Sequence, residues 1–109
     1  MTSPKPIEVS VTDVAALLEG GSVALIDCRE PDEWETARVE GATLIPMNST
    51  PDRLAEFPND RPIVVHCHHG MRSLRVAEYL RANGYPDAQS MAGGIDAWSQ
   101  HVDPGVPRY

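Results

Sequence analysis

The sequence PIVVHCHHGMRSLRVAEYLRAN, residues 62–83, joins an apolar run to a helical pattern through a short loop that contains a cysteine and a glycine. The run 62–66 is typical of a strand that is buried on both faces. The stretch 73–83 repeats apolar side chains at helical spacing, and Gly84 stands where helices commonly end. We therefore expect a strand, a tight loop and a helix in direct succession.

Such a loop favours chemistry at Cys67, which follows the strand directly. The N–H groups of the loop and of the first helical turn lack backbone partners, so they can converge on one negatively charged atom. The positive end of the helix dipole and the guanidinium of Arg72 both favour a thiolate over a thiol. We predict that Cys67 is a nucleophile.

Strand and helix patterns alternate along the rest of the chain. We expect strands at 7–11, 23–26, 43–45, 63–66 and 88–91, and helices at 13–19, 32–37, 52–57, 73–83 and 95–100. Thr12 is the expected cap of the first helix. The alternation predicts an α/β fold with a mostly parallel central sheet of about five strands and helices on both faces. In such sheets ligands bind beyond the carboxyl ends of the strands, where Cys67 lies.

The length of 109 residues and a composition of 41% hydrophobic and 23% charged residues indicate one globular domain. We expect this domain to cover residues 1–109, with a core at about 7–100 and an irregular tail at 102–109. The amino-terminal residues show no signal-peptide pattern, and no apolar run is long enough to span a membrane. We therefore predict a cytoplasmic protein whose thiols are reduced.

The net charge of −7 is spread unevenly along the chain. Residues 1–60 carry four basic and twelve acidic side chains (net −8), residues 61–81 carry four arginines and one glutamate (net +3), and residues 82–109 carry one arginine and three aspartates (net −2). The basic part coincides with the cysteine loop and suits a small anionic substrate. We interpret Arg75 and Arg81 as solvated. No long basic stripe is present, so we predict neither nucleic-acid nor membrane binding.

Four segments together resemble the rhodanese (sulfurtransferase) family, and most closely its single-domain members. They are the strand-end segment 25–30 with Asp27, Arg29 and Glu30, the segment 33–46, the loop 67–72 and the glycine-tryptophan segment 93–98. Their order and spacing match the family from about residue 7 to residue 98. The chain departs from the family at Ala37-Arg38, where Gly-His is frequent, and we expect a local change in packing there.

The resemblance implies that a sulfane sulfur is transferred from a donor such as thiosulfate to a thiophilic acceptor, cyanide or a thiol, through a persulfide on Cys67. The loop chemistry agrees with this, because a thiolate is a strong soft nucleophile and preorganised N–H groups would stabilise the terminal sulfur. We expect a small anionic sulfur donor, a sulfur-acceptor protein as a further partner, and no cofactor. The physiological donor and acceptor carry no signal in the sequence.

Arg72 closes the loop, and we assign it with Cys67 to catalysis. Its planar guanidinium can either hold an oxyanion through two hydrogen bonds or brace the loop through backbone carbonyls. Gly70 is expected to adopt a backbone angle that other residues resist. We interpret Ser73 as the cap of the helix, with donation of its hydroxyl to the persulfide as the alternative.

Side chains of a loop whose N–H groups face inward must point outward, so we expect His68, His69 and Met71 to line the rim. With Gly70 and Ser73 they form the predicted substrate-binding set. A proton-shuttle role for a histidine is the weaker alternative, because a thiolate attack moves no proton.

The cluster of histidines around Cys67 also invites a metal interpretation. Adjacent residues at a strand end point to different sides, and no spaced ligand pattern is present, so we predict no metal site. We interpret Cys28 as a small buried side chain, and its alternative role is a thiol that resolves a persulfide or an oxidised Cys67. Asp27 and Arg29 are expected to form a structural ion pair, and both tryptophans are expected in the core.

Two other functions compete with sulfur transfer. Phosphatases and arsenate reductases of related fold use a cysteine loop that ends in arginine with five residues between, whereas four separate Cys67 from Arg72. The tighter loop leaves less room for a tetrahedral phosphate. A non-catalytic module for protein binding or sulfur sensing is the other alternative, and the presence of Cys67, Gly70 and Arg72 argues against it.

Overall fold

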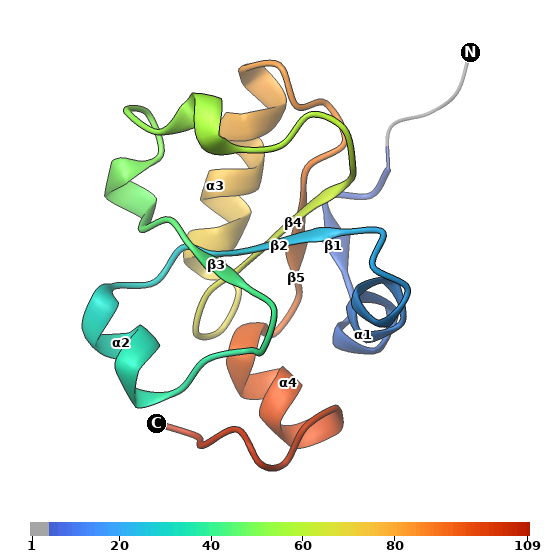
Figure 1. The fold of residues 1–109 in the computed structure, drawn as a ribbon, viewed down its shortest axis with the longest axis vertical. Coiled ribbons are helices and arrows are strands. Elements are labelled where there is room, and N and C mark those ends of the chain that lie inside the picture. Colours follow the sequence, from blue (N-terminus) through green and yellow to red (C-terminus); the bar gives the residue numbers. More distant parts are fainter. Residues whose placement is uncertain (1–4) are drawn as a thin grey trace.

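Five short strands form one sheet in the computed structural model, which describes residues 5–109 (Figure 1). The strands are β1 (Glu8–Val9), β2 (Ala24–Asp27), β3 (Thr43–Leu44), β4 (Ile63–His66) and β5 (Gln89–Met91). Their order in the sheet is β1-β5-β4-β2-β3, and every pairing is parallel. The predicted α/β class and parallel sheet are confirmed.

The central strand β4 has the bounds that the sequence predicts, and all four of its residues are buried. It pairs with β2 in a register that sets Ile26 beside Val65 and Asp27 beside His66. The two strands therefore end at the same level. The residues that follow them, Cys28 and Cys67, leave the sheet side by side.

Four α-helices and two short 3₁₀ segments connect the strands in the described part of the chain. They are α1 (Val11–Glu19), α2 (Pro31–Thr36), α3 (Met71–Ala82) and α4 (Gly94–His101), with 3₁₀ segments at Met47–Ser49 and Leu54–Glu56. The cores place α1 and α4 against one face of the sheet and α3 against the other (Figure 1). The expectation of helices on both faces is confirmed.

Two helices start two residues earlier than the sequence predicts. Helix α1 begins at Val11, and Ser10 caps it by accepting a hydrogen bond from the Asp13 N–H at 3.2 Å, whereas Thr12 was the predicted cap. Helix α3 begins at Met71 rather than at residue 73, because Gly70 takes a φ of 107° and turns the chain directly into the helix.

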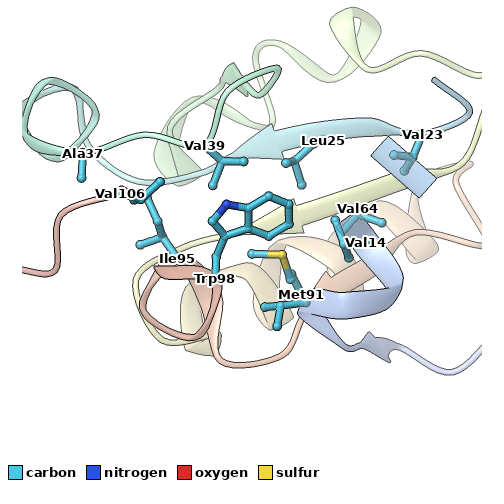
Figure 2. Close-up of a cluster of buried hydrophobic side chains, with 11 residues drawn as sticks. Val14, Val23, Leu25, Ala37, Val39, Val64, Met91, Ile95, Trp98 and Val106 are labelled. Atoms are coloured by element: carbon cyan, nitrogen blue, oxygen red, sulfur yellow. The ribbon is translucent and has the colours of Figure 1, made fainter. Parts of the chain in front are cut away.

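A first core lies between α1, α4 and the sheet, and the indole of Trp98 stands at its centre (Figure 2). Its buried members are Val11, Val14, Val23, Leu25, Ala37, Val39, Val64, Met91, Ile95, Trp98 and Val106. Val106 shows that residues 102–109, although irregular, contribute to this core. Trp34 does not lie in either core: it is half-buried, with the guanidinium carbon of Arg38 4.8 Å from its ring centroid.

The second core fills the opposite face, beneath α3. Its buried members are Ile26, Cys28, Ile45, Phe57, Ile63, Val65, Cys67, Val76, Leu80 and Ala88. Both cysteines therefore point to the α3 side of the sheet.

Residues 1–4 lie outside the described part of the chain, so the predicted lack of a signal-peptide pattern falls partly on residues without a structural description. Within residues 5–109, no helix is both long and apolar enough to cross a membrane.

The two tryptophans provide a paired test of the first core. We expect Trp98→Ala to lower the free energy of unfolding by about 3–5 kcal/mol, because it empties the centre of the cluster. Trp34→Ala should cost less than about 1 kcal/mol, because it removes a half-buried ring and an exposed cation–π contact. Urea unfolding followed by circular dichroism measures both. Equal losses in the two variants would contradict the described core.

Candidate active site

The loop after β4 is held from behind by helix α4. The N–H of Ile95 donates to the carbonyl oxygen of Cys67 at 2.8 Å, and the N–H of Asp96 donates to that of His68 at 3.1 Å. These N–H groups belong to the first turn of α4 and have no partner inside the helix. With its carbonyl groups engaged on this side, the loop directs N–H groups of Gly70 and Ser73 to the other.

Gly94 makes this contact possible. A methyl group on its Cα would overlap the backbone oxygens of Cys67 and His68, and its φ of 60° also disfavours other residues. The glycine pair of the segment 93–98 thus serves the loop, although it lies more than twenty residues further along the chain.

The sulfur of Cys67 lies at the focus of the loop. Its Sγ accepts hydrogen bonds from the N–H of Gly70 at 3.1 Å and from the N–H of Ser73 at 3.4 Å. The Ser73 hydroxyl oxygen lies 3.4 Å from the Cys67 sulfur, in hydrogen-bond contact. Cys67 itself is 1% exposed. The described geometry agrees with inward-facing N–H groups around this sulfur.

These contacts favour the thiolate. A hydrogen bond with Cys28 contributes most, the hydroxyl and N–H of Ser73 and the N–H of Gly70 add to it, and together they outweigh burial and lower the pKa of Cys67 to about 4. The same contact with Cys67, together with burial, raises the pKa of Cys28 far above its usual range. At neutral pH the pair therefore holds one negative charge, on Cys67, and one proton, on Cys28.

Ser73 does not cap helix α3, because it is the third residue of that helix and Gly70 occupies the cap position. Its buried hydroxyl instead lies 2.7 Å from the hydroxyl of Ser90, on strand β5. Once Cys67 is ionised, a chain of hydroxyl groups can donate from Ser90 to Ser73 and from Ser73 to the sulfur. Ser90 was not predicted, since a lone serine in a short strand pattern carries no functional signal.

Among residues 5–109, the hydrogen bonds of Arg72 go to Glu33 and not to the Cys67 sulfur or the loop carbonyls. Its two terminal nitrogens donate to the two carboxylate oxygens of Glu33 at 2.7 and 2.9 Å. This bidentate pair, with a smaller contribution from Tyr109, lowers the pKa of Glu33 to about 2. Glu33 is turned toward the loop because α2 begins with a capping box, in which the Glu33 carboxylate accepts from the N–H of Glu30 at 3.1 Å.

Asp27 and Arg29 form a completely buried ion pair at the end of β2, with 2.6 Å between Arg29 Nη2 and Asp27 Oδ2. The remaining Arg29 donors reach the carbonyl oxygens of Ala37 at 2.6 Å and Glu33 at 3.2 Å. The pair thus fastens α2, and with it Glu33, to the carboxyl edge of the sheet.

The irregular segment 102–109 reaches the same site, which the sequence did not predict. The hydroxyl of Tyr109 donates to Glu33 at 2.7 Å and accepts from Arg29 at 2.8 Å. Its ring stacks on His68, with centroids 4.0 Å apart and an interplanar angle of 8°. Aromatic stacking between residues 41 positions apart has no local sequence signal.

The predicted rim is therefore only partly open. His68 is sandwiched between Tyr109 and His69, whose ring centroid lies 3.9 Å away. His69 and Met71 point to solvent, with a side-chain exposure of 63% for the histidine and a residue exposure of 70% for the methionine. Only these two of the three predicted rim side chains lie at an open surface.

The structure also brings Asp96 to the two histidines, and one ligand atom from each of the three residues lies within 4.8 Å of the others. The sequence pattern did not group Asp96 with the two histidines, because Asp96 belongs to a separate helix, α4. Its carboxylate already accepts from Arg108 at 2.8 Å and from Gln100 at 2.9 Å. We therefore attribute the cluster to ion pairing and hydrogen bonding, and assign it no metal.

Comparison with known proteins finds a matching family and similar sequences. Residues 10–101 match the family model described as Rhodanese-like domain. The chain is 36% identical over 96 residues to the thiosulfate sulfurtransferase GlpE of Tolumonas auensis, covering 88% of this chain and 90% of that protein. It is 37% identical over 92 residues to the probable adenylyltransferase/sulfurtransferase MoeZ of Mycobacterium tuberculosis, covering 83% of this chain and 24% of MoeZ. This chain thus spans about a quarter of MoeZ.

Solved structures show the same likeness. The crystal structure of a rhodanese-like domain protein from Staphylococcus aureus superposes with a TM-score of 0.80 at 32% identity, covering 95% of this chain and 99% of that one. The superposition covers nearly the whole of both chains, so the two proteins share one architecture.

The ionisation of Cys67 can be titrated directly. We expect the ultraviolet absorbance of the thiolate to persist as the pH falls through neutrality and to disappear with a midpoint near pH 4, because hydrogen bonds favour the charged form. Ser73→Ala should raise the midpoint by about one unit or more, since a hydrogen bond to a charged group contributes about 1.5–3 kcal/mol.

Two variants control this titration. Cys67→Ser should abolish the transition, and Ser99→Ala should leave it unchanged, because Ser99 is another buried serine whose hydroxyl donates to the Val106 carbonyl instead. A wild-type midpoint near the usual thiol value of about 8.5 would contradict the described contacts.

Gly94 allows a test of the contact between α4 and the loop. Gly94→Ala should displace the loop carbonyls, raise the pKa of Cys67 by more than about one unit and cost about 1–3 kcal/mol of stability. Gly20→Ala is the matched control, because a methyl group there meets neighbours at ordinary contact distances. Circular dichroism verifies that both variants fold before titration. An unchanged pKa in folded Gly94→Ala would show that the loop does not depend on this contact.

Proposed function

The chain belongs to the rhodanese-like family, and from this premise we propose that it transfers a sulfane sulfur from a donor such as thiosulfate to a thiophilic acceptor through a persulfide on Cys67. It is an enzyme of the sulfurtransferase class. The observation that carries the proposal is the Cys67 sulfur, which is favoured as a thiolate and accepts two backbone N–H groups. A sulfur held in this way is both a nucleophile and a support for a second, charged sulfur.

In the first half-reaction the Cys67 thiolate attacks the outer sulfur of thiosulfate. A sulfur–sulfur bond forms to Cys67 while the sulfur–sulfur bond of the donor breaks, and sulfite leaves with the electron pair. The persulfide that remains carries one negative charge, as the thiolate did. No proton moves, so no histidine is needed as a base.

In the second half-reaction the acceptor attacks the outer sulfur of the persulfide. With cyanide the product is thiocyanate, and the Cys67 thiolate leaves with the electron pair and is regenerated. The N–H groups of Gly70 and Ser73 stabilise whichever sulfur carries the charge. Two half-reactions through one covalent intermediate give ping-pong kinetics.

The remaining site residues have supporting roles in this proposal. Arg72 acts through Glu33, because two hydrogen bonds hold its guanidinium against that carboxylate at the loop end. His69 and Met71 line the approach to the loop and contact the donor or acceptor first. His68, covered by Tyr109, shapes the wall of the approach.

The two cysteine thiols indicate the cellular compartment that we propose for the reaction. Both cysteines are free, which supports a reducing compartment, and we place the activity in the cytoplasm. The N–H groups of Gly70 and Ser73 that face the sulfur suit a small anionic donor, and an acceptor protein is the further partner that we propose. A non-catalytic binding module is the alternative that the next experiment separates.

Intact-protein mass spectrometry tests the persulfide. We expect the wild-type protein to gain one sulfur atom from thiosulfate and to lose it when cyanide is added, whereas Cys67→Ser gains none. The thiosulfate:cyanide rate should fall by at least about 10³-fold in Cys67→Ser. Glu78→Ala is the control and should keep the wild-type rate, because Glu78 is an exposed residue of α3 away from the loop. Equal rates for wild type and Cys67→Ser would favour the non-catalytic module.

A further inference from the structure

A second thiol lies beside the nucleophile. Cys28 and Cys67 follow the register pair Asp27–His66 at the ends of neighbouring parallel strands, and the N–H of Cys28 still donates to the carbonyl of His66 at 3.0 Å. Parallel strands lie about 4.8 Å apart. This spacing falls inside the range of about 4.4–6.8 Å between Cα atoms that a disulfide needs.

The two side chains share one face and one environment. Each cysteine is 1% exposed, and both belong to the core under α3. Each thiol is the largest single influence on the pKa of the other, lowering that of Cys67 and raising that of Cys28. Cys28 approaches the Cys67 sulfur from the β2 side, whereas the N–H groups of Gly70 and Ser73 approach from the loop and α3.

In the proposed sulfur transfer Cys28 favours the Cys67 thiolate but forms no bond itself. We propose that Cys28 is a resolving thiol, which attacks the sulfur of Cys67 whenever that sulfur carries a leaving group that no acceptor has removed. For the persulfide the leaving group is the outer sulfur, and this part of the inference rests on the proposed function.

The step balances without an external oxidant. The Cys28 sulfur forms a bond to the Cys67 sulfur, the bond to the outer sulfur breaks, and the outer sulfur leaves with the electron pair as sulfide. The proton of the Cys28 thiol departs with it as HS⁻. The sulfane sulfur is reduced, and the two cysteine sulfurs are oxidised to a disulfide.

The disulfide stops sulfur transfer because Cys67 is no longer a thiolate. A dithiol reductant restores the enzyme by thiol–disulfide exchange and is itself oxidised to a disulfide. Over a full cycle thiosulfate and the dithiol yield sulfite, sulfide and the oxidised dithiol. The persulfide is thus either passed to an acceptor or released as sulfide. Burial keeps the proton on Cys28, so an available acceptor reacts first.

The lifetime of the persulfide tests this role. The wild-type protein is loaded with thiosulfate, freed of excess donor and kept without an acceptor while intact mass and free sulfide are followed. We expect the added sulfur to disappear, one sulfide to be released per protein, and the mass to settle two hydrogens below that of the reduced protein. Dithiothreitol should restore the reduced mass.

Two variants near the end of strand β2 are compared with the wild type for the lifetime of the persulfide. In Cys28→Ser the persulfide should persist and sulfide release should slow by at least about 10-fold, because a serine hydroxyl cannot displace the sulfur. Ile26→Val shares the strand and the buried cluster, so its persulfide should decay as in the wild type. A persulfide equally long-lived in wild type and Cys28→Ser overturns the proposal.

Hydrogen peroxide makes the test independent of thiosulfate. Peroxide is added in excess: the first equivalent converts the Cys67 thiolate to a sulfenic acid, and attack by the Cys28 thiol then releases water and forms the same disulfide. A sulfenic acid that no thiol resolves is oxidised by a second equivalent to a sulfinic acid. If thiosulfate adds no sulfur, the proposed donor chemistry fails. The peroxide experiment alone then decides whether Cys28 is a resolving thiol. A disulfide in the wild type with further oxidation of Cys67 in Cys28→Ser supports the resolving role. Further oxidation of Cys67 in both proteins overturns it.

Discussion

The site depends on two hydrogen bonds that hold the back of the loop. Because the N–H groups of Ile95 and Asp96 bind the carbonyls of Cys67 and His68, the loop N–H groups are directed at the sulfur. The same bonds satisfy donors at the start of α4 that would otherwise lack partners. One contact therefore completes the end of a helix and organises a nucleophile. Gly94 is required because any side chain there would occupy the space of the loop.

Hydrogen bonds, rather than unpaired arginine side chains, stabilise the Cys67 thiolate. Arg72 is neutralised by Glu33, and Arg29 is neutralised by the buried Asp27. The basic character of residues 61–81 overstates the positive charge that the sulfur experiences. The Cys28 thiol, the Ser73 hydroxyl and the N–H groups of Gly70 and Ser73 instead favour the charged sulfur, and such fixed donors need no reorganisation when charge is present.

Much of the fold could be predicted because it depends on local patterns. Strand β4 and the order of strands and helices follow from apolar periodicity, and Cys67 follows from its place between strand and helix. The start of α3 shifted by two residues because Gly70 allows an abrupt turn. The partners within the site could not be predicted in the same way. Ser90, Glu33 and Tyr109 reach the loop from 17, 39 and 41 positions away along the chain, and each looks like an ordinary residue in its own segment.

The segment 102–109 stands apart from the four segments that carry the family likeness, yet it supplies a wall of the site through Tyr109. The Cys67 loop and the wall formed by Tyr109 are therefore encoded in separate stretches of the gene. Mutations in this tail can reshape the entrance while the thiolate and its donors remain intact. Such separation gives evolution a way to alter the surroundings of the cysteine loop without rebuilding the loop itself.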